Sequence, residues 1–162
     1  MVVSDLDSSE ELMIRLPNLF TDVMAGQYAK NVFYEKVKSV AERWIEQTLK
    51  MDEKAVERNK KADFCLLSAL WTPEGDEWGL RLVTDWNHWA FPWDDQFDEG
   101  HLKLDAPKAA DEVMNTLAIL DDTQPLISTE ENPISHAFQT VWLHFKEVRH
   151  STVVLVWRMS LF

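Results

Sequence analysis

Three aspartates stand close together in the stretch FPWDDQFDEG, residues 91–100. At about 100° per residue on a helix, Asp98 lies roughly 40° and Asp95 roughly 100° around the axis from Asp94. The three carboxylates therefore share one face of a helix. Magnesium prefers one or two carboxylates together with waters and the phosphate oxygens of a substrate, so this spacing indicates a site for Mg²⁺ and a phosphate-bearing molecule.

The arrangement costs stability when no cation is bound. Like charges four residues apart repel by roughly 0.2–0.5 kcal/mol, and each acid at the negative end of a helix loses another ~0.3–1 kcal/mol. A bound cation reverses both penalties. A plain solvated acidic helix end is the alternative that spacing alone leaves open. A calcium-binding loop that starts at Asp94 is excluded, because its sixth position needs glycine and is Glu99.

The residues before the aspartates predict an apolar surface beneath them. Asn87 and Phe91 precede Asp94 and Asp98 on the same helical face, with Thr84 and Leu80 further back. Phe91 and Asn87 are therefore the candidate substrate-binding residues. The tryptophans of this segment are expected to point away from that face, into neighbouring helices; they are Trp86, Trp89 and Trp93.

The periodicity of the chain predicts one all-α unit. Only 4 glycines and 6 prolines occur in 162 residues, which disfavours a β-sandwich or barrel. Apolar positions three and four residues apart, with capping residues, predict helices over 31–50, 52–71, 77–99, 105–122 and 131–150. Residues 1–12 are expected to be a flexible acidic leader and 13–150 the helical domain. The apolar tail, 151–162, is either a terminal strand or the start of further structure.

Composition argues against several classes of protein. A net charge of −12 repels phosphate backbones, which argues against nucleic-acid binding. The single cysteine, Cys65, allows no internal disulfide and indicates a cytoplasmic protein, with a buried thiol in the run FCLL. The longest candidate for a membrane segment, TVVLVW at 152–157, is far shorter than the ~20 residues needed to span a bilayer. The 5 histidines show no paired metal spacing.

The segment DWNHWAFPWDDQFDEG, residues 85–100, resembles the aspartate-rich DDxxD motif of class I terpene synthases, particularly fungal sesquiterpene cyclases. The upstream segments RLPNLF, AERWIEQ and KKADFCLLSAL agree with it, and the resemblance covers roughly residues 14–150. It implies a helical bundle around an apolar cavity. In such an enzyme Asp94 and Asp98 would bind the Mg²⁺ that grips the diphosphate of a prenyl substrate such as farnesyl diphosphate. Loss of diphosphate would leave an allylic carbocation, which Phe91 could stabilise while it cyclises.

The departures from the family pattern also matter. The family carries a second metal motif downstream, and LDDTQPLIS at 120–128 has paired acids without the glutamate that this motif requires. The family's diphosphate-sensing arginine and its C-terminal Arg-Tyr pair would lie beyond Phe162. The resemblance therefore implies the N-terminal half of the bundle, with weak or no activity alone and with exposed apolar surface through which it could associate. A fragment of an isoprenyl diphosphate synthase and a non-catalytic helical interaction protein are the alternatives.

Overall fold

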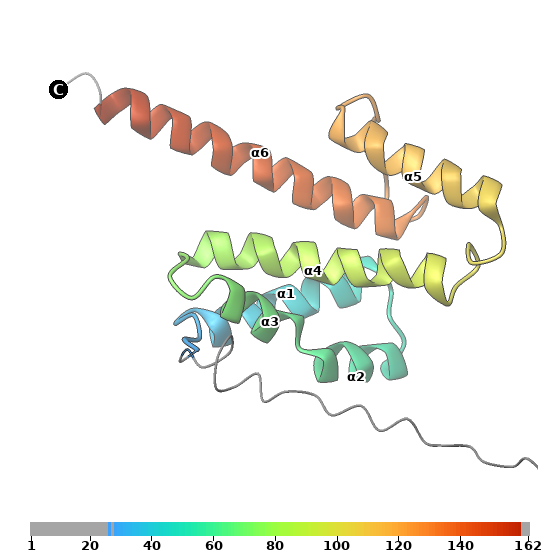
Figure 1. The fold of residues 1–162 in the computed structure, drawn as a ribbon, viewed down its shortest axis with the longest axis horizontal. Coiled ribbons are helices and arrows are strands. Elements are labelled where there is room, and N and C mark those ends of the chain that lie inside the picture. The colour runs from blue at the N-terminus through green and yellow to red at the C-terminus, as the bar shows by residue number, and fades with distance from the viewer. Residues whose placement is uncertain (1–25, 27, 160–162) are drawn as a thin grey trace, which may run out of the picture.

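The computed structural model describes residue 26 and residues 28–159, with side-chain surroundings as far as Glu147. This part of the chain contains six α-helices and no strand (Figure 1). They are α1 (Tyr34–Thr48), α2 (Glu53–Ala62), α3 (Phe64–Trp71), α4 (Glu77–Asp98), α5 (Ala106–Leu120) and α6 (Pro133–Met159). The all-α prediction is confirmed, whereas the predicted acidic leader, 1–12, lies outside the described residues.

Helix α4 lies in the middle of the arrangement, with α1 and α3 along one side, α6 along the other and α5 packed on α6 (Figure 1). One buried cluster joins α1, α3 and α4: Tyr34, Val37, Ala41, Cys65, Ala69 and Leu80. The other joins α1, α4, α5 and α6: Ile45, Trp89, Ile119, Ala137 and Phe138. Because apolar burial is the main favourable term in folding, these two clusters hold α4 from both sides and fix the position of its carboxyl end.

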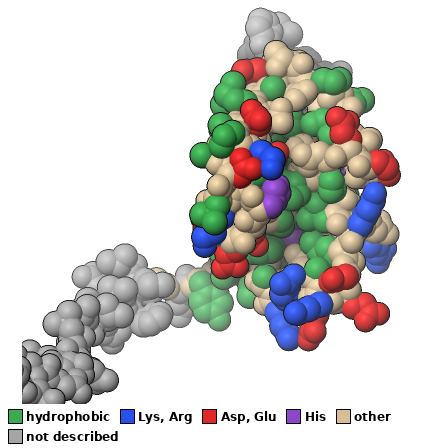
Figure 2. Space-filling model, turned by 90° about the vertical axis from the view of Figure 1, so that its right-hand side faces the viewer, with side chains coloured by type: hydrophobic (Ala, Val, Ile, Leu, Met, Phe, Trp, Pro, Cys, Tyr) green, Lys and Arg blue, Asp and Glu red, His purple; other side chains and the backbone are tan. Residues whose placement is uncertain are grey.

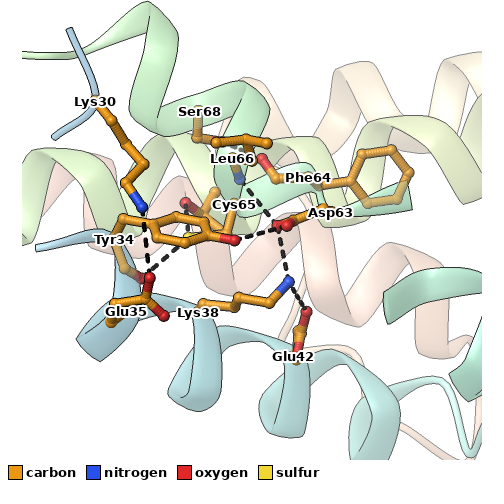
Figure 3. A network of polar contacts seen from close by, with 11 residues as sticks. Lys30, Tyr34, Glu35, Lys38, Glu42, Asp63, Phe64, Cys65, Leu66 and Ser68 are labelled. Carbon is orange, nitrogen blue, oxygen red and sulfur yellow. Dashed lines mark hydrogen bonds and ion pairs between the residues drawn. The ribbon is translucent and has the colours of Figure 1, made fainter. Parts of the chain in front are cut away.

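The predicted helix over 52–71 is in fact two helices, which meet at Asp63. This residue has φ 49° and ψ 56°, in the left-handed region, so it ends α2 and begins α3. Asp63 accepts a hydrogen bond from Leu66 N at 3.1 Å and from the Tyr34 hydroxyl at 2.6 Å, and it pairs with Lys38 at 2.8 Å (Figure 3). The residues on both sides of Asp63 follow a helical pattern, but the contacts of Asp63 with α1 accompany a break that this pattern does not predict.

Helix α4 begins and ends close to the predicted positions. Asp76 caps its first turn by accepting a hydrogen bond from Gly79 N at 2.7 Å. At the other end Gly100 N donates to Asp95 O at 2.8 Å. A Cβ on Gly100 would lie 2.7 Å from the Cα of Gln96, so the chain needs glycine where it leaves the helix. Pro92 lies inside the helix.

The sequence expectation holds for the range of α5 and fails for the end of α6. Helix α5 has the expected range and begins at the cap Asp105, and it buries Ile119, whereas Val113, Leu117 and Leu120 are exposed. Helix α6 continues through the tail to Met159, so the hypothesis of a terminal strand is wrong. Among the described residues, no helix has the length and apolar character to cross a membrane.

Candidate metal and substrate site

The three aspartates singled out in the sequence lie in the last turns of α4. All three are exposed, and none has an ion-pair or side-chain hydrogen-bond partner among the described residues. The last turn of α4 carries no basic residue either. The carboxylates therefore add to the negative end of the helix dipole with nothing nearby to compensate them, which favours a cation at this end.

An apolar groove leads along α4 to the first of these aspartates. Its part next to the carboxyl end has a volume of about 360 Å³ and is lined by Trp86, Asn87, Trp89, Ala90, Phe91, Trp93 and Asp94. A further hollow of about 430 Å³ lies where α4, α5 and α6 meet, and its lining is apolar throughout: Leu82, Val83, Trp86, Leu120, Phe138, Val141, Trp142 and Phe145. Trp86 lines both hollows, which are together called the groove. Of the described side chains that line either part, Asp94 is the only ionisable one.

Aromatic rings at the base of this groove come from α4 and α6. Trp89 is buried and stacks on Phe138 with ring centroids 4.1 Å apart, as expected for a side chain directed at a neighbouring helix. Trp86 also meets Phe138 of α6 edge to face, with ring centroids 6.0 Å apart, although it is 45% exposed; its other ring neighbour is Trp89, edge to face at 4.9 Å. The helical periodicity therefore gives the direction of Trp86 correctly, but it does not show how much of the ring the neighbouring helix covers.

The three carboxylates do not converge on one point. Asp94 lines the groove, Asp95 lines a different cavity beside α2, and Asp98 lines neither. In the part of the chain that the structure describes, no group of three or more acidic, histidine or cysteine side chains is arranged to hold a metal. Such an open set suits a cation that takes most of its ligands from water and substrate, as Mg²⁺ does, rather than one held in a closed protein cage.

The two predicted substrate-binding residues differ in their surroundings. Phe91 is 42% exposed, and its ring stacks on Phe64 of α3 with centroids 4.3 Å apart. Asn87 is 3% exposed, and its amide donates a hydrogen bond to the Ser68 hydroxyl at 2.9 Å. Both border the groove, but the Asn87 side chain is already engaged in joining α4 to α3.

Figure 2 views the molecule from the side at which α4 ends. Hydrophobic side chains line the hollow in the middle of this face, and acidic and basic side chains stand mainly around its edge. The arrangement suits a molecule with an apolar body and a charged end.

Comparison with known proteins identifies the family. The family described as Terpene synthase family 2, C-terminal metal binding, matches residues 85–159, which include all three aspartates. Terpene cyclase 4 of Gibberella fujikuroi is 37% identical over 149 residues, which are 91% of this chain and 41% of that protein. The (1R,4R,5S)-(-)-guaia-6,10(14)-diene synthase of Fusarium mangiferae is 40% identical over 136 residues, 83% of this chain and 34% of that protein. The chain belongs to the class I terpene synthase family of the fungal type.

This terpene synthase chain spans less than half the length of these relatives. A further relative, named as an inactive guaia-6,10(14)-diene synthase of Gibberella fujikuroi, is also 40% identical over 136 residues. Proteins that are 40% identical to this chain therefore include both one named as a synthase and one named as inactive.

The terpene synthase chain also has buried polar groups on α4 that the sequence analysis did not single out. Asp85 is 1% exposed, and both of its oxygens accept from Arg81 Nε at 2.7 Å. Burial raises the pKa of Asp85 to about 6, although the Arg81 guanidinium opposes the rise. Arg81 and Asp85 are four residues apart, which places them on the same face of a helix, so the sequence could have predicted this ion pair.

His88 is equally buried, and both of its ring nitrogens lack a hydrogen-bond partner among the described residues. Burial, together with the nearby charges of Arg81 and Lys38, lowers its pKa to about 4. The ring meets Phe64 edge to face at 5.7 Å, so His88 packs as a neutral aromatic side chain. Cys65 is buried as predicted, and burial raises the pKa of its thiol to about 11, which makes it a poor nucleophile.

The acids of the segment LDDTQPLIS have structural surroundings. Asp121 ends α5, as predicted, and Asp122 follows it in the left-handed region with φ 56°. The Asp122 carboxylate accepts hydrogen bonds from the Trp142 indole at 3.2 Å and from the Lys146 ammonium, which lowers its pKa. These contacts join the end of α5 to α6.

Proposed function

We propose that this chain carries the substrate-ionising part of a sesquiterpene synthase, which binds farnesyl diphosphate together with Mg²⁺. One observation carries the proposal: the unpaired carboxylate of Asp94 stands at the end of the apolar groove that Trp86 lines. A prenyl diphosphate has the matching shape, with a hydrocarbon chain and an anionic end. The names of the relatives support the reaction class, namely guaiadiene and eremophilene synthases.

In this proposal Asp94 and Asp98 hold the metal. When bound, Mg²⁺ supplies positive charge that neutralises the diphosphate and helps it to leave. The chain itself has a net charge of −12, so an anionic substrate would be repelled without such a cation. Asp95 lies toward the cavity beside α2 and contributes less, through its negative field alone.

The groove residues act on the hydrocarbon. The apolar walls exclude water, which would otherwise react with an allylic cation. The faces of Trp86 and Phe91, both partly exposed, offer about 0.5–2 kcal/mol of cation–π stabilisation to a positive charge nearby. Asn87 fixes the position of this wall through its bond to Ser68. We propose that turnover by this chain alone is weak, since the groove is open and no second acidic metal motif accompanies the first.

Calorimetric titration of the chain with Mg²⁺ in the presence of pyrophosphate tests the proposal. We expect saturable binding that Asp94→Asn weakens at least tenfold and Asp95→Asn less than threefold. Asp111→Asn is the matched control, because it removes an exposed carboxylate on α5, away from the groove. The proposal fails if wild-type chain shows no metal-dependent pyrophosphate binding, or if Asp111→Asn weakens it as much as Asp94→Asn does.

Incubation with farnesyl diphosphate and Mg²⁺ then identifies the reaction. Cyclic hydrocarbons, detected by gas chromatography, support the synthase activity. An elongated prenyl chain would instead indicate an isoprenyl diphosphate synthase. Binding with neither product leaves the substrate-binding function in place and excludes turnover by this chain.

A second candidate function is a non-catalytic one, in which the chain associates with another protein. The exposed apolar side chains on α5 and α6 favour it, since Met114 is 64% and Phe145 43% exposed. Large apolar patches on a protein surface commonly mark interaction sites. Light scattering of the purified chain tests whether this surface associates, and the Mg²⁺–pyrophosphate titration tests substrate binding independently of that result.

A further inference from the structure

The two hollows of the groove along α4 have one side chain in common. The front hollow, of about 360 Å³, includes Asp94 in its wall. The rear hollow, of about 430 Å³, lies where α4, α5 and α6 meet and is apolar throughout. Of the described residues that line them, Trp86 alone belongs to both. The walls of the two hollows therefore coincide at the Trp86 indole.

The position of Trp86 relative to Asp94 matches the length of a hydrocarbon chain. Trp86 precedes Asp94 by eight residues within α4. At a rise of roughly 1.5 Å per residue, the two positions are about 12 Å apart along the helix axis. This separation is on the scale of an extended prenyl chain. A molecule whose charged end is held at Asp94 would therefore bring the far end of its chain to the indole.

Two neighbouring rings hold the indole in place. Trp86 meets Trp89 edge to face at 4.9 Å and Phe138 edge to face at 6.0 Å. Trp89 and Phe138 are buried and stack on each other at 4.1 Å. Edge-to-face contacts of this kind are favourable beyond the area that they bury, so they stabilise one orientation of the ring. The indole, which is 45% exposed, is therefore a fixed part of the groove wall.

The rear hollow would reward a longer chain if the chain could enter it. Each hollow by itself has a volume within the ordinary range of small-molecule sites. Affinity for an apolar chain rises with the apolar area that binding removes from water. The way in which affinity changes with chain length therefore reports whether a chain stays in the front hollow or passes Trp86.

We propose that Trp86 sets the length of prenyl chain that the groove accepts. Its indole closes the front hollow at the length of a farnesyl chain and keeps longer chains out of the rear hollow. The inference rests on the proposed function, because it takes the diphosphate end to be held at Asp94. It adds a determinant of substrate length to the metal site and to the cation–π role of the same ring.

Calorimetric titration with three analogues in the presence of Mg²⁺ tests the inference. They are geranyl, farnesyl and geranylgeranyl S-thiolodiphosphate, in which sulfur replaces the bridging oxygen and slows ionisation. For wild type we expect the farnesyl analogue to bind at least about fivefold more tightly than the geranyl one, and the geranylgeranyl analogue to bind no more tightly than farnesyl. Trp86→Ala should bind the geranylgeranyl analogue at least about fivefold more tightly than farnesyl. Trp86→Phe, which keeps a ring, should retain the wild-type order.

Two further variants separate a partition from a general enlargement of the groove. Leu82→Ala enlarges the rear hollow but keeps the indole, so it should not make the geranylgeranyl analogue the tightest. Trp71→Ala removes an exposed tryptophan of α3 that lines neither hollow, and should retain the wild-type ratios. The ratios are compared within each variant, so that a general loss of affinity cancels, and circular dichroism shows that each variant is folded.

A measurement on the wild-type chain needs no variant to fold. Nuclear Overhauser contacts should join the terminal methyl groups of the bound farnesyl analogue to the Trp86 indole and not to Leu120, which lines the rear hollow alone. Contacts with Leu120 would overturn the inference. So would tighter binding of geranylgeranyl by wild type, or the same order of affinities in Trp86→Ala as in wild type. If wild type binds pyrophosphate with Mg²⁺ and these results are not found, this inference fails alone; if it binds none, the proposed function fails first.

Discussion

At the scale of single residues, two groups in the interior of α4 respond to pH in opposite directions. Burial raises the pKa of Asp85 to about 6 and lowers that of His88 to about 4. The raised carboxyl pKa adds stability as pH falls from about 6 toward the ordinary value of 3.8. The lowered imidazole pKa removes stability as pH falls from 6.5 toward about 4, because the unfolded chain takes up the proton first. The two effects largely cancel in the wild-type chain.

Replacing the histidine should reveal the effect of the aspartate. We expect His88→Leu to lose less stability than wild type, or to gain some, when pH is lowered from 7 to 5. The pH-induced change in the free energy of unfolding should differ between the two proteins by about 2 kcal/mol. This figure is 1.36 kcal/mol for each pH unit between 6.5, the ordinary pKa of histidine, and the final pH of 5. Urea unfolding followed by tryptophan fluorescence at both pH values measures it.

Both nitrogens of His88 lack partners, so leucine removes no hydrogen bond and the comparison isolates the titration. Identical pH dependence for His88→Leu and wild type would contradict the assignment of a neutral, buried imidazole.

At the scale of elements, the junction of α2 and α3 is the point where local and tertiary preferences compete. The residues on both sides of Asp63 favour helix, and the break at this residue is held by the network in Figure 3. Burial raises the pKa of the Asp63 carboxyl, but its bonds to Lys38, Tyr34 and Leu66 N outweigh this and leave the pKa lowered. For Lys38, burial lowers the pKa and the carboxylates of Asp63 and Glu42 raise it by more. The pair is therefore ionised at neutral pH and ties α1 to the junction.

Asp63→Ala should destabilise the chain by about 2–4 kcal/mol. The substitution removes a helix cap, worth ~1 kcal/mol, and hydrogen bonds to a charged group, worth roughly 1.5–3 kcal/mol. Asp52→Ala removes a cap alone and should cost about 1 kcal/mol, which makes it the matched control. Urea unfolding at pH 7 compares the two. Equal losses would mean that the contacts with Tyr34 and Lys38 add nothing to the cap.

The same junction shows what the sequence could and could not predict. Caps and periodicity located α4 and α5 well, because Asp76, Gly100 and Asp105 act within one turn of their own helix. The break at Asp63 depends on Tyr34, which is 29 residues away, so local pattern missed it. In the candidate site, the sequence predicted the aspartates and the apolar surface before them. It could not predict that Trp86 lines the groove or that Asp95 faces a different cavity, since both depend on which neighbouring helix is present.

At the scale of the whole molecule, the apolar side chains are unevenly covered. Helix α4 is packed from two sides, whereas α5 buries only Ile119 among its residues and packs mainly on α6. The side chains left exposed on α5 and α6 include Val113, Met114, Leu117, Leu120, Leu143 and Phe145. Apolar side chains that are exposed to water on neighbouring helices favour association where they form a patch.

We therefore expect the purified chain to self-associate at micromolar concentration, measured by size-exclusion chromatography with light scattering. The double substitution Met114→Glu with Leu117→Glu should shift it toward the monomer, because each glutamate places a charge that association would have to desolvate. Lys54→Glu changes the net charge by the same amount on the exposed face of α2 and should leave the association unchanged. Weak interfaces form at concentrations on the order of 100 µM. If the wild-type chain stays monomeric at that concentration, α5 needs no partner to cover its exposed apolar side chains. Equal dissociation by Lys54→Glu would instead assign the effect to net charge, and the surface on α5 would then have no part in it.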